Sequence, residues 1–166
     1  MNTAEINQVM NSMQTTKHNY MGTFPSDKLS FPTRFPSCFI ANLDSSNQPG
    51  SHWVAVYLTK TGKAEFYDTY ARQPPPIFKE YLESNFSVLR INQRQTQSFG
   101  TSVCGQHCIY FLYHRCCGRK MDTILLSLRK DTVDNDISVC DWVNSNFNED
   151  TPLIDLDQMQ TATLFQ

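Results

Sequence analysis

"HWVAVYLTKTGKAEFYDTY", residues 52–70, predicts a β-hairpin at the centre of the fold. After His52 the first half is apolar on both faces and contains two valines, which is typical of a central strand covered on both sides. Residues 63–70 are its expected neighbour. The loop between them, residues 60–62, has glycine in third place, where a type I turn followed by a left-handed residue requires one.

The length of this loop also sets the register of the hairpin. Thr59 is expected opposite Lys63, which brings His52 opposite Tyr70. Asp68 then lies on the same face as His52, as its diagonal neighbour. Backbones of diagonal neighbours are about 7–8 Å apart, a gap that an imidazole and a carboxylate can close. The hairpin therefore predicts a His52–Asp68 pair, whereas a two-residue loop would place the two on opposite faces.

Hydrophobic periodicity and turn residues predict the elements around the hairpin. A proline-containing loop is expected from 22 to 37, and no membrane-spanning run or signal peptide is found. Strands are expected at 38–44 and 87–92. Helices are expected at 3–13 with Thr3 as N-cap, at 77–86, from Cys104 to a stop at Gly118, at 121–130, and at 136–147 with Asn135 or Asp136 as N-cap.

Length and composition predict one compact domain. The chain has 166 residues, 40% hydrophobic and 12% aromatic, which is enough apolar material for one core. We expect that domain to span 1–148, followed by a tail at 149–166. A formal charge of −2 gives no strong field towards nucleic acid or an anionic membrane. The six cysteines are expected to be free thiols in an intracellular, monomeric protein.

A second stretch, "QSFGTSVCGQHC" (97–108), places Cys104 at the expected start of a helix. A thiol attacks a carbonyl as the thiolate, and a helix N-terminus together with a histidine stabilises that anion. His52, oriented by Asp68, is the histidine that the hairpin makes available. Acyl transfer also needs donors to the oxyanion, and the Gln97 amide with the backbone N–H of Cys104 is one workable pair.

The same stretch has two other interpretations. Free cysteine is among the most buried residue types, so Cys104 can serve only as packing at the start of an apolar helix. Cys104, His107 and Cys108 also share one helical face at the spacing of metal ligands. The second paired motif that is typical of zinc sites is missing, so we expect no metal and interpret Cys108 as a core residue.

Three motifs in a fixed order resemble the adenovirus-type cysteine endopeptidases (adenain) and, more distantly, the proteases of ubiquitin-like proteins. They are "HW" (52–53), "FYDTY" (66–70) and "TQSFGTSVCG" (96–105), within a resemblance that runs from about residue 20 to residue 147. The resemblance implies a papain-like α+β fold with a small central mixed sheet and with the catalytic cysteine at the N-terminus of a buried helix.

The resemblance also assigns roles to individual residues. Cys104 would be the nucleophile, His52 the general base and later acid, and Asp68 the residue that orients His52. Gln97 would donate to the oxyanion together with the backbone N–H of Cys104. Trp53 and Gly105, which follow the histidine and the cysteine in the motifs, become candidate substrate-binding residues.

The substrate implied by the resemblance is a protein. Proteases of the viral branch cut precursor proteins after a small residue, often glycine. Those acting on ubiquitin-like proteins typically place Asp before the nucleophile, whereas this chain has Val103. We therefore expect maturation of capsid or core proteins of a virus or virus-like DNA transposon, in the host nucleus or cytoplasm or packaged in virions.

Two departures from the adenoviral pattern bear on cofactors. Adenoviral proteases are basic and activated on DNA, whereas this chain is slightly acidic, so activation by DNA is not expected. They are tethered to a peptide activator through a cysteine upstream of the glutamine, but residues 85–97 contain none. We expect no cofactor and no disulfide tether, and a peptide bound without a covalent link stays open. The alternatives are a protease of ubiquitin-like modifiers, an acyltransferase with the same triad, and a non-catalytic peptide-binding module.

Overall fold

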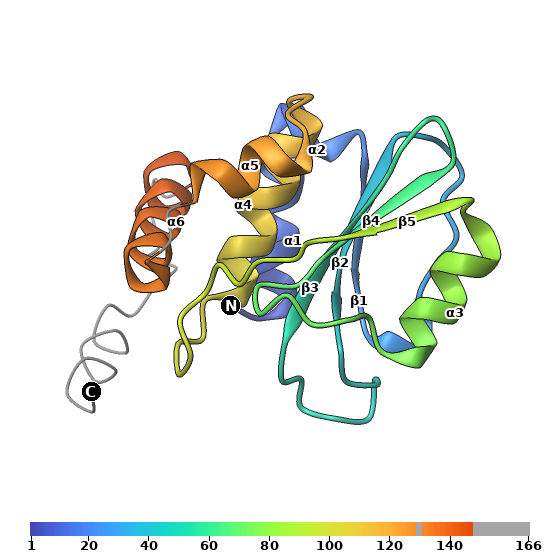
Figure 1. The fold of residues 1–166 in the computed structure, drawn as a ribbon, viewed down its shortest axis with the longest axis horizontal. Helices are drawn as coiled ribbons and strands as arrows, with labels where there is room; N and C mark the ends of the chain where they lie inside the picture. The colour runs from blue at the N-terminus through green and yellow to red at the C-terminus, as the bar shows by residue number, and fades with distance from the viewer. Residues whose placement is uncertain (129–130, 148–166) are drawn as a thin grey trace.

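In the computed structural model, which describes residues 1–128 and 131–147, a five-stranded sheet lies between helices (Figure 1). The strands are β1 (Tyr20–Phe24), β2 (Ser37–Asn42), β3 (Trp53–Leu58), β4 (Lys63–Tyr67) and β5 (Val88–Ile91). The helices are α1 (Thr3–Ser12), α2 (Gln14–Lys17), α3 (Pro76–Asn85), α4 (Cys104–Cys116), α5 (Met121–Ser127) and α6 (Thr132–Phe147), with a short 3₁₀ helix, η1 (Ser26–Lys28). The expected α+β class is confirmed.

The sheet is mixed, and its centre is the predicted hairpin. The strand order is β1-β2-β3-β4-β5, with parallel pairs at both edges and antiparallel pairs in the middle. Val56 pairs with Phe66, and the Thr59 N–H donates to the Lys63 carbonyl at 2.8 Å. Gly62 adopts a φ of 72°, the left-handed conformation that the three-residue loop requires. The predicted register is confirmed.

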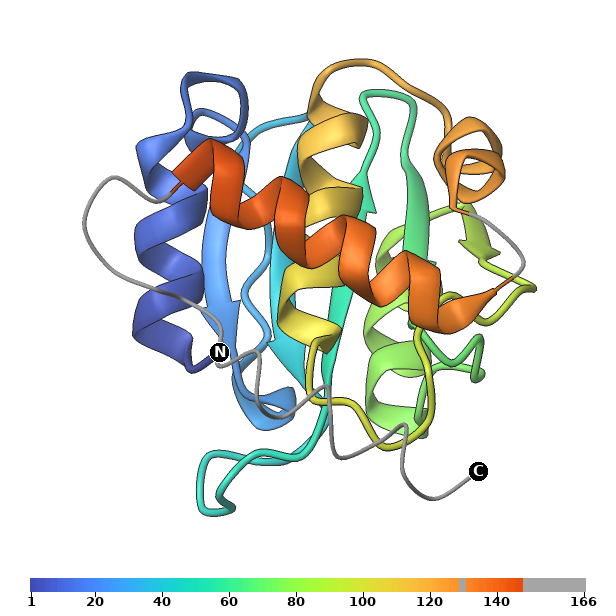
Figure 2. The same cartoon turned by 90° about the vertical axis from the view of Figure 1, so that its left-hand side faces the viewer.

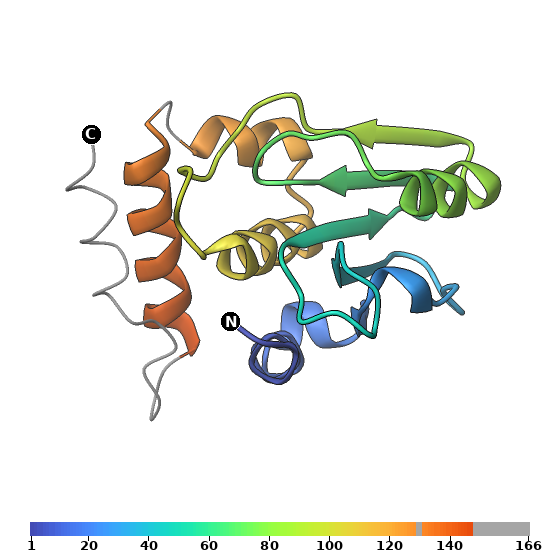
Figure 3. The same ribbon diagram turned by 90° about the horizontal axis from the view of Figure 1, so that it is seen from below.

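Successive residues of the central strands point to opposite faces, so the sheet has a core on each side. The core against α3 contains the strand residues Val54 and Phe66 together with Phe78 and Leu82 of the helix. The other core lies against α1 and α4, as the view from below shows (Figure 3). Its fully buried helix residues include Ile6, Met10, Ile109, Phe111 and Leu112. Helix α6 crosses the outer side of α4 (Figure 2).

Strand β1 was not predicted, and the expected loop at 22–37 begins inside it. Its five residues include Gly22 and are followed by Pro25, a composition that is atypical of a strand. The strand forms because it pairs in parallel with β2, so that Tyr20 lies beside Cys38. A pairing of this kind between separate segments leaves no periodic pattern in the sequence.

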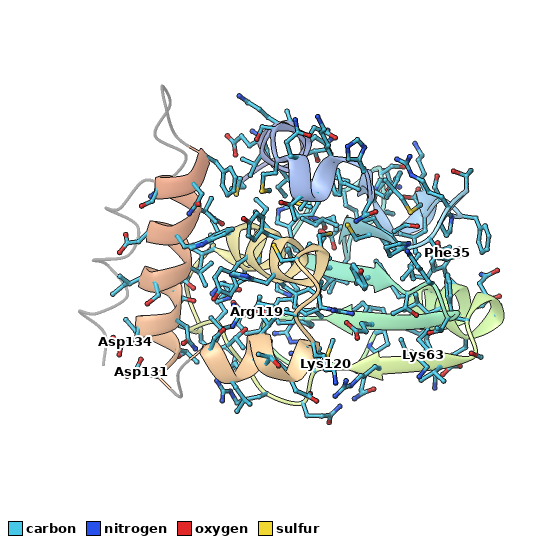
Figure 4. All side chains as sticks on the ribbon, turned by 90° about the horizontal axis from the view of Figure 1, so that it is seen from above. Phe35, Lys63, Arg119, Lys120, Asp131 and Asp134 are labelled. Atoms are coloured by element: carbon cyan, nitrogen blue, oxygen red, sulfur yellow. The ribbon has the colours of Figure 1, made fainter. Side chains whose placement is uncertain are left out.

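Two predicted helix starts were wrong. The N-cap of α1 is Asn2, not Thr3: its side chain accepts from the Ala4 and Glu5 N–H groups in a capping box. Helix α6 begins at Thr132, where Asp131 accepts from the backbone N–H of Val133 at 2.8 Å (Figure 4). Asn135 and Asp136, the expected caps, are buried inside the helix instead.

No helix in the ranges 1–128 and 131–147 is long and apolar enough to cross a lipid bilayer. The expected tail at 149–166, with the last two residues of the predicted helix at 121–130, lies outside the described residues.

Candidate active site

A cleft of about 750 Å³ opens where the start of α4 meets the chain's first residues and the β2–β3 loop. Figure 1 shows the N-terminus beside the start of α4. Four residues that the sequence singled out line this cleft together: His52, Trp53, Gln97 and Cys104. They come from three places in the chain, residues 52–53, 97 and 104, which the central hairpin and α4 bring to one end of the sheet.

Cys104 is the first residue of α4, as predicted, and its side chain is almost buried. Burial raises the pKa of its thiol. Hydrogen bonds from His52 and from the Trp53 backbone, with the positive charge of His52, outweigh burial and lower the pKa below its ordinary value. The side chain of the N-cap residue, Val103, is apolar and makes no capping hydrogen bond, so the first N–H groups of α4 can bind an anion. This environment favours the thiolate.

His52 and Asp68 form the predicted pair: Nε2 lies 2.7 Å from Asp68 Oδ1, and both side chains are buried. A carboxylate only accepts, so Nε2 carries the hydrogen and Nδ1 is the nitrogen available to Cys104. Burial alone would lower the pKa of His52, but the hydrogen bonds and charges of Asp68 and Cys104 raise it to about 9. The imidazolium form therefore persists at neutral pH.

Asp68 is itself held in place by residues that the sequence did not single out. Its Oδ1 also accepts from the Tyr70 N–H at 2.9 Å. Asn92 pins its backbone, accepting from the Asp68 N–H at 2.9 Å and donating to the Asp68 carbonyl at 2.7 Å. Asn92 is one polar residue among many in its segment, so no signal in the sequence separates it from its neighbours.

An aromatic stack covers the His52 ring. The Tyr70 ring lies on it with centroids 5.0 Å apart, and the Phe99 ring lies on Tyr70 at 5.4 Å. The Arg72 guanidinium lies over the Tyr70 ring at 4.8 Å. The predicted register, which places Tyr70 opposite His52, was the available signal for this contact. Phe99 is 70% exposed, so the stack runs from the buried histidine to the surface.

Gln97 is fully buried at the cleft wall. Its Oε1 accepts from Thr69 Oγ1 at 2.6 Å, and its Nε2 donates to the Thr101 carbonyl at 2.8 Å and to Thr101 Oγ1 at 3.2 Å. The amide cannot be turned around, because its oxygen would then face the Thr101 carbonyl. The donor end of Gln97 thus points towards Thr101, which also lines the cleft.

The two candidate substrate-binding residues lie in different places. Trp53 lines the cleft, and its Nε1 donates to the Met1 carbonyl at 3.1 Å. Gly105 is buried in α4 and does not line the cleft. A Cβ at Gly105 would lie 3.3 Å from Met1 Cβ and 3.5 Å from Ile6 Cδ1, so the glycine allows α1 to pack closely on α4.

The three residues at metal-ligand spacing are engaged elsewhere. His107 is fully buried and its Nε2 lies 2.8 Å from Asp136 Oδ1. Cys108 is fully buried, and burial, with the charges of Cys104 and Asp68, raises the pKa of its thiol. Within the described parts of the chain, no group of three or more His, Cys, Asp or Glu side chains is arranged to hold a metal ion.

The chain is similar in sequence to a viral protein. It is 28% identical over 97 residues to the "Putative thiol protease R355" of Acanthamoeba polyphaga mimivirus, a match that covers 52% of this chain and 32% of the viral protein. The chain thus matches only about a third of the length of that curated relative. No protein-family model matches the chain.

Solved structures share the fold at low sequence identity. The ASFV pS273R protease matches with a TM-score of 0.55 and 12% identity, covering 78% of this chain and 63% of its own. ChlaDub1 from Chlamydia trachomatis matches at 0.51 and 14%, covering 95% and 78%. The central domain of Lpg1148 from Legionella pneumophila matches at 0.53 and 14%, covering 87% and 97%. These matches confirm the papain-like fold class, and the narrower adenovirus-type assignment stays a prediction.

Proposed function

We propose that this chain is a cysteine peptidase in which Cys104, His52 and Asp68 form the catalytic triad. One observation carries the proposal. A thiol with a lowered pKa begins α4 in a cleft, beside a histidine whose Nε2 is held at 2.7 Å by a buried aspartate. Acyl transfer requires a nucleophile, a base beside it and an acid that orients the base, and the three residues meet these requirements. The similarity to a putative viral thiol protease supports the same class.

The chemistry follows from the positions of these groups. The Cys104 thiolate attacks the scissile carbonyl, forming an S–C bond, and the carbonyl oxygen becomes an oxyanion. The backbone N–H of Cys104 donates to that oxygen. The Gln97 amide also donates to it, with the hydrogen that otherwise makes the longer contact to Thr101 Oγ1. The imidazolium of His52 gives its Nδ1 proton to the leaving amine as the C–N bond breaks. His52 then takes a proton from water as the water oxygen bonds to the acyl carbon. The S–C bond breaks, which releases the acyl group as an acid and restores the thiolate.

The proposed substrates are capsid or core precursor proteins of a virus or virus-like transposon, cut after small residues such as glycine. The similarity to a mimivirus protein supports the viral setting. The predicted host compartment belongs to the same proposal, which requires no cofactor and no activating peptide. The alternative, a protease of ubiquitin-like modifiers, uses the same residues and is distinguished by its substrate.

Incubation with a peptide library followed by mass spectrometry tests the proposal. Cleavage after small residues is expected for the wild-type chain and is lost in Cys104→Ala and His52→Ala. Cys117→Ala is the matched control, because Cys117 is an exposed cysteine at the opposite end of α4. Cleavage that survives Cys104→Ala would remove the assignment.

Two further substrates separate the alternatives. Release of a fluorophore from the C-terminus of a ubiquitin-like protein, without cleavage of the library, would favour the modifier protease. Transfer of label from acetyl-CoA to Cys104 would favour the acyltransferase with the same triad.

A further inference from the structure

A second buried histidine–carboxylate pair lies behind the cleft. His107 follows Cys104 by three positions in α4, Asp136 lies in α6, and both side chains are fully buried. Neither residue lines the cleft, so neither is placed to touch a substrate bound there. Burying two such groups is costly unless each is hydrogen-bonded, so their partners indicate what the pair holds in place.

Asp136 joins three segments of the chain. Its Oδ1 lies 2.8 Å from His107 Nε2, which ties α6 to α4. Its Oδ2 accepts from the Ser98 N–H at 3.1 Å and from Thr101 Oγ1 at 2.9 Å, which ties α6 to the loop before Cys104. Both carboxylate oxygens are therefore used, one for the helix that carries the nucleophile and one for the loop beside it.

Thr101 connects this junction to Gln97. The Gln97 amide donates to the carbonyl and to Oγ1 of Thr101, while its own oxygen accepts from Thr69. The direction of the amide therefore depends on where Thr101 lies. The single hydroxyl hydrogen of Thr101 has two acceptors within reach, Asp136 Oδ2 at 2.9 Å and the Ser98 carbonyl at 3.0 Å. Thr101 depends on Asp136 because a carboxylate binds a hydroxyl hydrogen more strongly than a neutral carbonyl does.

We propose that Asp136 and His107 are positioning residues that set the oxyanion site. They hold Thr101, and through it the Gln97 amide, at a defined place relative to the backbone N–H of Cys104. The inference rests on the proposed function, because the oxyanion is the one formed at Cys104. The proposed peptidase chemistry does not use the buried His107–Asp136 pair, and the inference gives that pair a function.

This network meets the residues on either side of Asp68, because His107 Nδ1 lies 3.4 Å from the Tyr67 hydroxyl and Thr69 Oγ1 donates to Gln97, but it does not include the Asp68 carboxylate. Asp68, which orients His52, is held by the Tyr70 N–H and by Asn92, and it makes no hydrogen bond to Asp136 or Thr101 among the described residues. Loss of the Asp136 junction should therefore weaken oxyanion binding and leave the reactivity of the thiolate unchanged.

Thr101→Val tests the junction, with Thr101→Ser as the matched control that keeps the hydroxyl. The first readout is the dissociation constant of a peptide ending in glycinal. The Cys104 thiolate bonds to its aldehyde carbon, and the negative oxygen that forms lies in the oxyanion site before it takes the proton of the His52 imidazolium, so the affinity of the peptide reports that site. The second readout is the rate at which iodoacetamide alkylates Cys104. This reaction displaces iodide and forms no oxyanion, so its rate reports the reactivity of the thiolate alone. Thr101→Val should weaken glycinal binding by about tenfold and leave alkylation unchanged, and Thr101→Ser should retain the affinity.

A double-mutant cycle shows whether the effect passes through Gln97. In a Gln97→Ala background, adding Thr101→Val should cost no further affinity, because the amide that Thr101 positions is already gone. Asp136→Asn and His107→Gln should change glycinal affinity in the same direction as Thr101→Val. The inference is overturned if valine and serine behave alike, if the cycle is additive, or if alkylation falls as much as affinity.

The two hypotheses fail differently. A wild-type chain that binds the glycinal peptide but cleaves no peptide would overturn the proposed function, and the affinities would still decide the positioning role. A wild-type chain that neither cleaves nor binds would overturn both.

Discussion

His52 and Asp68 lie on one face of the central hairpin, with His52 Nε2 2.7 Å from Asp68 Oδ1. The contact depends on a loop of three residues, because a change of one residue would move Asp68 to the opposite face of the sheet. The pair faces Cys104. His52 and Cys104 shift each other's pKa in opposite directions: the pKa of the histidine rises and the pKa of the thiol falls. Thiolate and imidazolium therefore coexist, which gives the first prediction.

The pH dependence of kcat/KM should be bell-shaped. Activity rises as Cys104 loses its proton, at a pH below the ordinary thiol pKa. It falls as His52 loses its proton, near pH 9, because the neutral ring can no longer protonate the leaving amine. Initial rates between pH 5 and pH 10 on one peptide measure both limbs. An alkaline limb at the pKa of an unperturbed histidine, about 6.5, would contradict the ion pair.

Asp68→Asn should shift the alkaline limb of the same profile to lower pH. The carboxylate raises the pKa of His52, so replacing it by a neutral amide lowers that pKa. The amide also allows the ring to bind in the wrong tautomer, so kcat should fall by about a hundredfold or more. Glu83→Gln, which removes an exposed carboxylate on α3, is the control for the change in net charge alone. An unmoved limb would show that Asp68 does not determine the pKa of His52.

Gln97→Ala should lower kcat by about a hundredfold, with a smaller effect on KM, because the amide acts on the oxyanion and not on the bound substrate. Steady-state kinetics on a cleaved peptide measure the split. Gln93→Ala is the control, since Gln93 is a nearby exposed glutamine whose amide donates to the Ile91 carbonyl and that does not line the cleft. Equal kcat for Gln97→Ala and wild type would remove Gln97 from the oxyanion site.

Tyr70→Ala should lower kcat/KM by about fivefold, because the Tyr70 ring covers one face of the His52 ring. Tyr70→Phe keeps the ring and the stacking, so it should retain most of the activity. Measuring kcat/KM of both variants on one substrate tests the prediction. If phenylalanine is as poor as alanine, the hydroxyl and not the ring is what matters.

The buried Arg115–Glu65 pair predicts a stability effect far from the cleft. Arg115 Nε donates to Glu65 Oε2 at 2.6 Å, and the guanidinium lies over the Tyr57 ring at 4.3 Å. Arg115→Met should reduce the free energy of unfolding by about 3 kcal/mol, because it leaves the Glu65 carboxylate buried without its partner. The double variant Arg115→Met/Glu65→Leu should recover most of that loss. Urea unfolding of both variants measures it, and equal losses would contradict the ion pair as the cause.

The sequence by itself determined the features that depend on short-range geometry. The glycine in the 60–62 loop sets the hairpin register, and that register brings Asp68 to His52. The apolar stripe after Cys104 sets where α4 begins. Each depends on bond angles, turn type or helical period over a few residues, so it can be derived without knowing what lies across the fold.

The tertiary structure alone decided the features that depend on partners distant in the chain. Strand β1 forms only because β2 lies beside it. Asp136 is not the N-cap that the sequence predicted, because α6 begins at Thr132 and Asp136 lies inside the helix, where it contacts His107. Gly105 lies where Met1, Ile6 and Trp53 approach α4, and it is not among the residues that line the cleft. A polar side chain can satisfy its hydrogen bonds locally or across the fold, and only the packed arrangement of helices and sheet selects which of these it does.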